Sequence, residues 1–384
     1  MLDASQQRIL TTHTGSLPRP PDLAERMLEY SNGTEKDPPG LWEQVASATR
    51  DVVKRQVDLG LDIVSDGEFG KASYAGYVKE RLTGFDGEPR RTFGGMREQA
   101  EFPDWVRSST PRVTFPSNNG PVSLRDRSAV RRDIANLSAA LQGLNPAGVF
   151  MTAASPGVVD TFMPSTYYAL EQDFLHALGA AMRDEYQAIV EAGFILQIDC
   201  PDLAMSRHTR FVDRSDAEFR DVARMHVAVL SEALAGLPRD RVRLHMCWGN
   251  YEGPHNHDIP LAEILDIALQ APVGGISIEA ANPRHAHEWQ LFRDVELPEG
   301  VQLIPGVIDS CTNYIEHPEL VAERIVRFAE VVGRERVIAG TDCGFGTSVG
   351  PRHVAPSIAW AKLQSLVEGA RIASRQLWPV AAAV

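Results

Sequence analysis

The sequence lacks any apolar run long enough to cross a membrane, which takes about 20 residues, and it has no recognisable signal peptide. Its first residues, MLDASQQRILTTH, carry neither a basic start nor an apolar stretch behind it. Basic residues are also in the minority, because 38 Lys and Arg stand against 51 Asp and Glu, a net charge of −13. That balance argues against binding to nucleic acid or to an anionic membrane. We therefore expect a cytoplasmic globular protein whose partners are small molecules, and the sequence leaves open whether it forms a homo-oligomer.

Cysteine is scarce as well. The chain of 384 residues has four cysteines, and they are widely separated. Four cysteines cannot hold together a fold of this size through disulfides, and in a reducing compartment metal binding or catalysis is the more natural use. They stand at positions 200, 247, 311 and 343.

Apolar residues, in contrast, are plentiful at 43% and occur in short β-branched runs that alternate with helix-length amphipathic stretches. The predicted helices include 170–193 and 317–333, where apolar residues recur every three or four positions. Eight repeats of strand and helix predict an α/β protein with a (β/α)8 TIM barrel in a single domain, 1–384, and an open doubly wound sheet is the alternative. The predicted strands are 61–68, 148–157, 194–200, 241–247, 274–280, 302–310, 336–344 and a weaker run at 111–116.

Two segments stand outside this repeat. Residues 1–60 precede the first predicted strand, and we expect an N-terminal extension that caps or crosses the barrel. Residues 84–132 are rich in Gly, Pro, Ser and Arg and are predicted to be an insertion after the first barrel strand.

Residues suited to chemistry gather at the carboxyl ends of the predicted strands, which is where barrels of this kind build their active sites. His245 and Cys247 end one strand, and their spacing of two places both side chains on the same face. With Cys343 they offer one nitrogen and two sulfur ligands, a set that suits a catalytic Zn²⁺ with an open position. The full set at strand ends is Glu68, Asp199, His245, Cys247, Glu279, Asp309, Asp342 and Cys343.

Plainer readings exist for each of these residues. A single His-x-Cys pair is often part of a hydrophobic core, and one acidic residue at a strand end is more often a helix cap or half of an ion pair. Alternation turns Cys200 toward the helices, where it would be inert. Cys311 follows Asp309 by two residues and is expected to lie beside the site.

Taken together, the motifs resemble the C-terminal catalytic barrel of the cobalamin-independent methionine synthase family, and the resemblance spans most of the chain. This family includes short relatives such as the epoxyalkane:coenzyme M transferases. The order of the motifs carries the resemblance more than any one of them. They are TTHTGSLPRP at 11–20, DGE at 66–68, LQIDCPDLA at 196–204, HMC at 245–247, ISIEA at 276–280 and GTDCGFGT at 340–347.

The resemblance implies a zinc-dependent S-methyltransferase of the 5-methyltetrahydropteroyltriglutamate–homocysteine type, in which zinc ionises a thiol that then attacks a methyl donor. It implies that Glu279 joins His245, Cys247 and Cys343 as zinc ligands. It also implies that Glu68 and Asp199 hold the ammonium group of an amino-acid thiol, and that Gly15 and Ser16 touch this substrate.

Two departures from the family leave the donor open. The family's methionine synthases are about twice as long, and where they have a histidine that assists the leaving group this chain reads GVIDSC, which makes Asp309 and Cys311 the candidate catalytic residues. A thiol is a poor substitute for imidazole as an acid. A methylcobalamin-dependent synthase and thiol alkylation by an epoxide remain alternatives. So do a zinc-free decarboxylase of the same superfamily and a zinc-holding protein that is not an enzyme.

Overall fold

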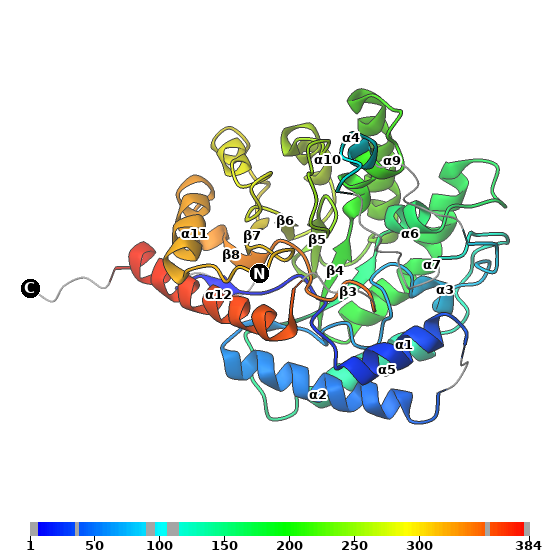
Figure 1. Ribbon diagram of the computed structural model, residues 1–384, viewed down its shortest axis with the longest axis horizontal. Coiled ribbons are helices and arrows are strands. Elements are labelled where there is room, and N and C mark those ends of the chain that lie inside the picture. The colour runs from blue at the N-terminus through cyan, green and yellow to red at the C-terminus, as the bar shows by residue number, and fades with distance from the viewer. Residues whose placement is uncertain (1–6, 35–37, 90–96, 106–114, 350–353, 380–384) are drawn as a thin grey trace, which may run out of the picture.

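The protein forms a barrel of eight parallel strands with helices outside it (Figure 1). The computed structural model describes residues 7–34, 38–89, 97–105, 115–349 and 354–379. Neighbouring strands follow the order β1-β8-β7-β6-β5-β4-β3-β2, and the predicted (β/α)8 architecture is confirmed. The strands are β1 (Leu10–Thr11), β2 (Ile63–Val64), β3 (Gly148–Ala154), β4 (Ile195–Asp199), β5 (Val242–Met246), β6 (Gly275–Ile278), β7 (Gln302–Ile308) and β8 (Ile338–Thr341).

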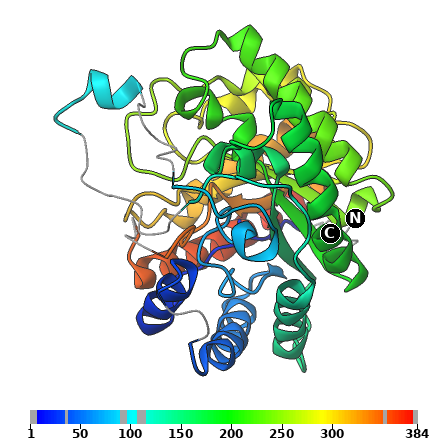
Figure 2. The same ribbon diagram turned by 90° about the vertical axis from the view of Figure 1, so that its right-hand side faces the viewer.

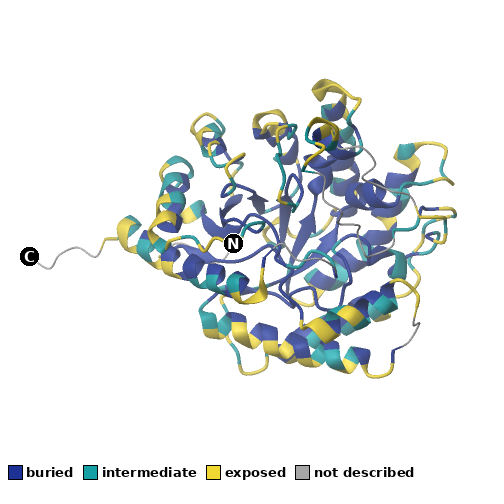
Figure 3. Cartoon of the chain, in the orientation of Figure 1, coloured by how far each residue is buried: buried dark blue, intermediate teal, exposed yellow. Residues whose placement is uncertain are grey.

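The helices follow the strands in turn, and their apolar faces cover the barrel. Figure 3 shows the strands buried and the outward faces of the helices exposed. The predicted helices 170–193 and 317–333 are confirmed as α7 and α11. The α-helices are α1 (Pro21–Ser31), α2 (Leu41–Leu59), α3 (Val78–Arg81), α4 (Arg97–Glu101), α5 (Ser128–Ala140), α6 (Pro156–Phe162), α7 (Glu171–Glu191), α8 (Ser206–Thr209), α9 (Asp216–Ala233), α10 (Leu265–Ala268), α11 (Pro318–Val332) and α12 (Pro356–Leu377).

The prediction that residues 1–60 only extend the barrel is wrong, because β1 is the first barrel strand and pairs with β8. The strand predicted at 61–68 is therefore the second. The weak strand predicted at 111–116 lies mostly outside the described residues, and Pro116 within it makes only an isolated antiparallel bridge to Pro89. β1 escaped notice because two residues in a polar setting give no alternating pattern.

The insertion at 84–132 lies between β2 and β3, and its last residues begin α5. Its described middle part contains α4, which stands out from the barrel (Figure 2). Glu98 of α4 accepts a hydrogen bond from the Tyr251 hydroxyl at 2.8 Å, and Glu101 accepts one from Asn256 at 2.9 Å. The insertion therefore contacts the loop that follows β5 through hydrogen bonds. No helix in the described part of the chain has the length and apolar character to span a membrane.

Asp62 joins the two strands at the seam between β1 and β2. Its backbone N–H donates to the carbonyl oxygen of Thr11 at 3.2 Å, and its carboxylate accepts from the backbone N–H of Thr11 at 2.8 Å. The same carboxylate accepts from Arg8 at 2.9 Å. The seam therefore depends on one acidic side chain as well as on backbone pairing.

We expect Asp62→Ala to lower the free energy of unfolding by about 1–3 kcal/mol, because it leaves a partly buried N–H group without an acceptor. Urea denaturation measures the change. Asp58→Ala is the control, since Asp58 forms only an exposed ion pair with Lys54, and its effect should stay within about 0.5 kcal/mol. Equal losses in the two variants would contradict the role of Asp62 at the seam.

Candidate metal centre and substrate pocket

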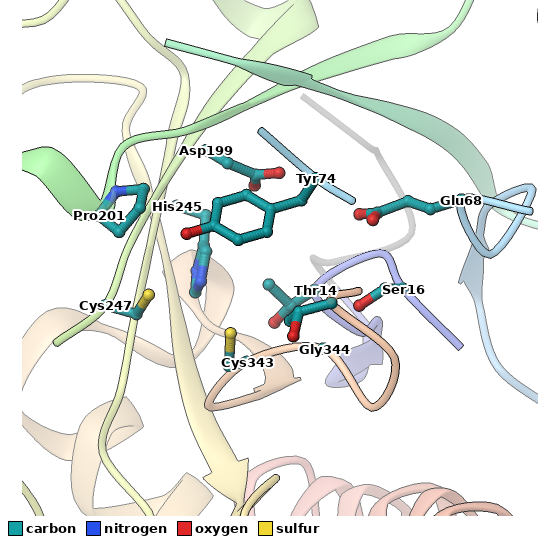
Figure 4. Close-up of a pocket in the computed structure, with 11 residues that line it drawn as sticks. Thr14, Ser16, Glu68, Tyr74, Asp199, Pro201, His245, Cys247, Cys343 and Gly344 are labelled. Carbon is teal, nitrogen blue, oxygen red and sulfur yellow. The ribbon is translucent and has the colours of Figure 1, made fainter. Parts of the chain in front are cut away.

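His245, Cys247 and Cys343 meet at the carboxyl end of the barrel. One ligand atom from each lies within 4.8 Å of those of the other two, and all three side chains are buried. His245 belongs to β5, Cys247 follows it directly, and Cys343 follows β8. Figure 4 shows the two sulfurs and the imidazole facing a common space. Residues 98 positions apart in sequence are thus brought together by the closure of the barrel.

The three side chains fit a zinc ion. The Nδ1 atom of His245 lies 3.3 Å from the Ser277 hydroxyl, whereas its Nε2 atom is buried and has no hydrogen-bond partner among the described residues. A hydrogen bond from Cys343 lowers the pKa of the Cys247 thiol well below its usual value, and the same pairing raises the pKa of Cys343. One free imidazole nitrogen and two sulfurs, one of them readily ionised, form a donor set that Zn²⁺ prefers.

Glu279, the fourth predicted ligand, lies near this group, but its carboxylate is bonded to other groups. One carboxylate oxygen accepts from the backbone N–H of Trp248 at 3.0 Å, and the other accepts from the Asn282 amide at 2.6 Å. Burial, and then the charge of Cys247, raise the pKa of Glu279 well above its ordinary value. Among the described residues, the ligand atoms of this group that lie within 4.8 Å of one another come from His245, Cys247 and Cys343, and Glu279 contributes none.

Glu68 enters the same pocket from a strained turn after β2. Gly67 and Glu68 both have a positive φ, 67° and 62°, a conformation that costs a non-glycine residue roughly 1–2 kcal/mol. Arg19 holds this turn by donating to the carbonyl oxygen of Glu68 at 2.7 Å. The carboxylate accepts from Thr152 at 3.1 Å through one oxygen, and its other oxygen is buried with no hydrogen-bond partner among the described residues. Such strain at a buried acid is typical of a functional position.

Asp199, at the end of β4, is the second acid of the pocket. Its carboxylate accepts from the Gln197 amide at 2.7 Å. Burial raises the pKa of Asp199 and of Glu68, and the negative charge of Asp199 raises that of Glu68 further. The charge of Lys71 lowers both pKa values but only partly offsets this rise, so a further cation brought between the two carboxyl groups would be stabilised.

The pocket connects the two acids with the metal centre (Figure 4). Its empty space, including the open mouth, is about 350 Å³. Tyr74 lies between Glu68 and the sulfurs. The lining residues are Thr14, Ser16, Glu68, Tyr74, Asp199, Pro201, His245, Cys247, Cys343, Gly344 and Thr347.

Two glycines allow the N-terminal segment to pack against this pocket. A Cβ atom on Gly15, whose φ is +133°, would lie 2.6 Å from the Glu68 carboxylate. A Cβ atom on Gly344 would lie 1.9 Å from the Ser16 hydroxyl. Of the predicted pair Gly15 and Ser16, only Ser16 is among the described residues that line the pocket, and Gly15 packs against Glu68 instead.

Asp309 and Cys311 are not among the described residues that line the pocket. The Asp309 carboxylate accepts from the backbone N–H groups of Cys311 at 3.1 Å and Thr312 at 2.8 Å, so it shapes the loop after β7. The Cys311 thiol donates to the Asn250 side chain at 3.1 Å, and burial raises its pKa well above the ordinary value. Asp342 likewise accepts backbone N–H groups, from Ala280 and its two successors.

Comparison with known families decides the identity of this barrel. The model of the cobalamin-independent synthase catalytic domain matches residues 165–370, more than half of the chain. The chain belongs to the cobalamin-independent methionine synthase family. It is therefore an enzyme of the methionine synthase family.

The family's relatives match nearly the whole chain. Methionine synthases from Sulfolobus acidocaldarius and Saccharolobus solfataricus are each 26% identical, over 368 and 370 residues, and each alignment covers 96% of this chain. It also covers 93% and 95% of those proteins, so they are of similar length, and the double length expected of the family is not general.

Solved structures of the family share the fold. A B12-independent methionine synthase from Shewanella sp. W3-18-1, in complex with selenomethionine, superposes with a TM-score of 0.76 at 22% identity, covering 96% of this chain and 99% of that one. A putative vitamin-B12-independent methionine synthase from Listeria monocytogenes gives 0.65 at 18% identity, covering 97% and 100%.

Sequence reasoning missed five residues that line the pocket of this methionine synthase family member: Thr14, Tyr74, Pro201, Gly344 and Thr347. Four of them lie within motifs that were recognised, and membership of these motifs was the available signal: Thr14, Pro201, Gly344 and Thr347. Tyr74 had no such signal, because nothing in its local sequence separates it from a core tyrosine. Of the arginines in the insertion, Arg97 donates to the Val212 carbonyl, and Arg90, Arg91, Arg107 and Arg112 lie outside the described residues.

Proposed function

We propose that this protein is a methionine synthase that transfers a methyl group to the sulfur of homocysteine at a zinc centre formed by His245, Cys247 and Cys343. One observation carries the proposal. A buried group of one imidazole and two sulfurs shares a single small pocket with two buried carboxyl groups whose pKa values are raised despite the nearby charge of Lys71. The names of the archaeal relatives support the same activity.

Homocysteine has a thiol and an ammonium group at opposite ends of a short chain, and the pocket has matching groups at its two sides. The thiol would lie at Cys247 and Cys343, and the ammonium would lie between Glu68 and Asp199. There it would supply the positive charge that the raised pKa values of both acids call for. Ser16 offers a hydroxyl on the wall of the pocket beside Gly344 (Figure 4).

Zinc, when bound, would lower the pKa of the substrate thiol, so that the thiol can lose its proton within the pocket and act as a nucleophile. Glu279 would complete the ligand set when the thiol is absent, after release from Trp248 and Asn282. In the transfer, the sulfur electron pair forms a bond to the methyl carbon. The bond between that carbon and the donor breaks, and the donor keeps its electron pair.

The protein's help to the leaving group is limited. Cys311, predicted to take the place of the family's histidine, holds its proton tightly because burial raises its pKa, and its thiol is bonded to Asn250. A general acid works best when its pKa lies near the working pH. The identity of the methyl donor is therefore the open point of the proposal, and the decisive test compares methyl donors.

The test incubates zinc-loaded protein and homocysteine with methyl-labelled 5-methyltetrahydrofolate, as mono- and triglutamate, and with labelled methylcobalamin. We expect labelled methionine, detected by mass spectrometry, from at least one of these donors. Coenzyme M with an epoxide is the comparison, and we expect no adduct, because its sulfonate would be repelled by Glu68 and Asp199. A coenzyme M adduct with no methionine from any methyl donor would reject the proposal.

A further inference from the structure

A second group of metal-type ligands lies away from the pocket, where three helices meet. Asp160 of α6, Glu171 at the start of α7 and His226 of α9 each offer one ligand atom, and these atoms lie within 4.8 Å of one another. Asp160 and His226 are buried, and Glu171 is partly buried. None of the three belongs to the centre formed by His245, Cys247 and Cys343.

The orientation of His226 separates this group from a chance cluster of acids. The Nδ1 atom lies 2.8 Å from the carboxylate of Asp202, and the side chain is only 1% exposed. The Nε2 atom is buried and has no hydrogen-bond partner among the described residues.

The ring of His226 packs against the helix α6. A Cβ atom on Gly157 would lie 2.4 Å from Nδ1 of His226, so the Nδ1 edge of the ring faces Gly157. Asp160 lies three residues further along α6, on the same face of the helix. The ring of His226 and the Asp160 carboxylate therefore lie on the same side of α6, with one ligand atom of each within 4.8 Å of the other. A carboxylate that holds one imidazole nitrogen while the other is free is the usual arrangement around a metal-binding histidine.

We propose that Asp160, Glu171 and His226 bind a divalent transition-metal ion, of which Mn²⁺ and Zn²⁺ are the chemical representatives. One imidazole nitrogen and two carboxylate oxygens suit these ions better than Mg²⁺ or Ca²⁺, which prefer oxygen ligands alone.

Arg210 now supplies the positive charge at this place. Its guanidinium contacts the carboxylate of Asp160 and lies 3.1 Å from that of Glu171. The Arg210 side chain is 23% exposed, so it has a path to solvent when an ion takes its place. The proposal therefore makes Arg210 a competitor of the metal for Asp160 and Glu171. If Arg210 formed a purely structural ion pair with these acids, no metal ion would compete with it.

The position also links the ion to the substrate pocket. Asp202 accepts a hydrogen bond from the Ser155 hydroxyl at 2.5 Å, and it follows Pro201, which lines the pocket. Ser155 caps α6. A bound ion would thus tie three helices to one wall of the pocket through His226 and Asp202.

The experiment first loads the thiolate centre with an equimolar amount of zinc, which the sulfur ligands take up in preference to the second site, and then adds Mn²⁺ alone to the full chain. Electron paramagnetic resonance counts the bound Mn²⁺, and pulsed measurements detect nitrogen from a coordinated imidazole. We expect one Mn²⁺ per chain with a nitrogen coupling. His226→Gln should abolish that coupling, and Glu171→Gln should weaken binding. Asp202→Asn should weaken it by about 10- to 100-fold.

Arg210→Gln gives the sharpest outcome, since removal of the competitor should tighten Mn²⁺ binding several-fold. The matched control is His176→Gln, because His176 pairs with Glu232 on an exposed surface and should leave binding unchanged. Absence of Mn²⁺ binding in both the wild type and Arg210→Gln would overturn the proposal. So would a nitrogen coupling that survives in His226→Gln, or weaker binding in Arg210→Gln. If His226→Gln does not fold, Glu171→Gln and Arg210→Gln still decide the question.

Discussion

Replacement of Cys247 or Cys343 by serine should remove both the metal and the activity. Each sulfur is one of the three close ligand atoms found in the described part of the chain, and a hydroxyl group is a far weaker ligand for zinc. Loss of the metal removes several kcal/mol of transition-state stabilisation, so kcat/KM for homocysteine should fall by about 10³-fold or more. Metal content, measured by inductively coupled plasma mass spectrometry, should fall from about one zinc per chain to near zero.

Cys311→Ser is the matched control for metal content. Cys311 is a cysteine near the centre whose thiol is bonded to Asn250, and the group of close ligand atoms does not contain it within the part of the chain that the structure describes. Zinc should therefore remain bound in that variant. A wild-type protein that keeps full activity after its metal has been stripped would contradict the zinc mechanism, and so would a Cys247→Ser variant that keeps both metal and activity.

The second large effect concerns Asp199 and the recognition of the amino group. Asp199→Asn keeps the shape of the side chain but removes the charge that would bind an ammonium. A hydrogen bond to a charged group contributes about 1.5–3 kcal/mol, so kcat/KM for homocysteine should fall by about 10- to 100-fold. With 4-mercaptobutyrate, which is homocysteine without its amine, the same variant should react as slowly as the wild type. Steady-state kinetics with both thiols measure the difference.

Asp309→Asn is the control for selectivity. Asp309 binds backbone N–H groups in the loop after β7, so any loss in this variant should be the same for both thiols. Glu68→Gln should instead repeat the selective loss seen with Asp199→Asn, because the two acids share the pocket. Equal losses for both thiols in Asp199→Asn would remove the case for an ammonium site.

The sequence predicted the parts of this site that depend on strand periodicity. His245 and Cys247 share a face because side chains alternate along β5, and Cys343 joins them because parallel strands end at the same rim of a barrel. The long amphipathic helices α7 and α11 were predicted for a similar reason, since their apolar positions follow the helical repeat.

The missed features depend on contacts between distant segments. The direction of Glu279 is set by the N–H of Trp248 and the amide of Asn282, which no local pattern reveals. Tyr74 reaches the pocket from an irregular turn. The two-residue strand β1 is recognisable only by its pairing with β8. The run at 111–116 has strand-like composition, yet its described residues form no strand.

The pocket draws its walls from both ends of the chain. The Thr14 hydroxyl donates to the carbonyl oxygen of Thr341 at 2.9 Å, and the N–H of Phe345 donates to the carbonyl oxygen of Ser16 at 2.8 Å. During synthesis the segment around Thr14 leaves the ribosome first and waits for more than 300 residues before its partner emerges. His245 and Cys247 have left long before Cys343, so a nascent chain can offer zinc only an incomplete site. Metal acquisition should therefore wait until Cys343 has emerged, and a truncated chain that lacks β8 and Cys343 should not retain the ion.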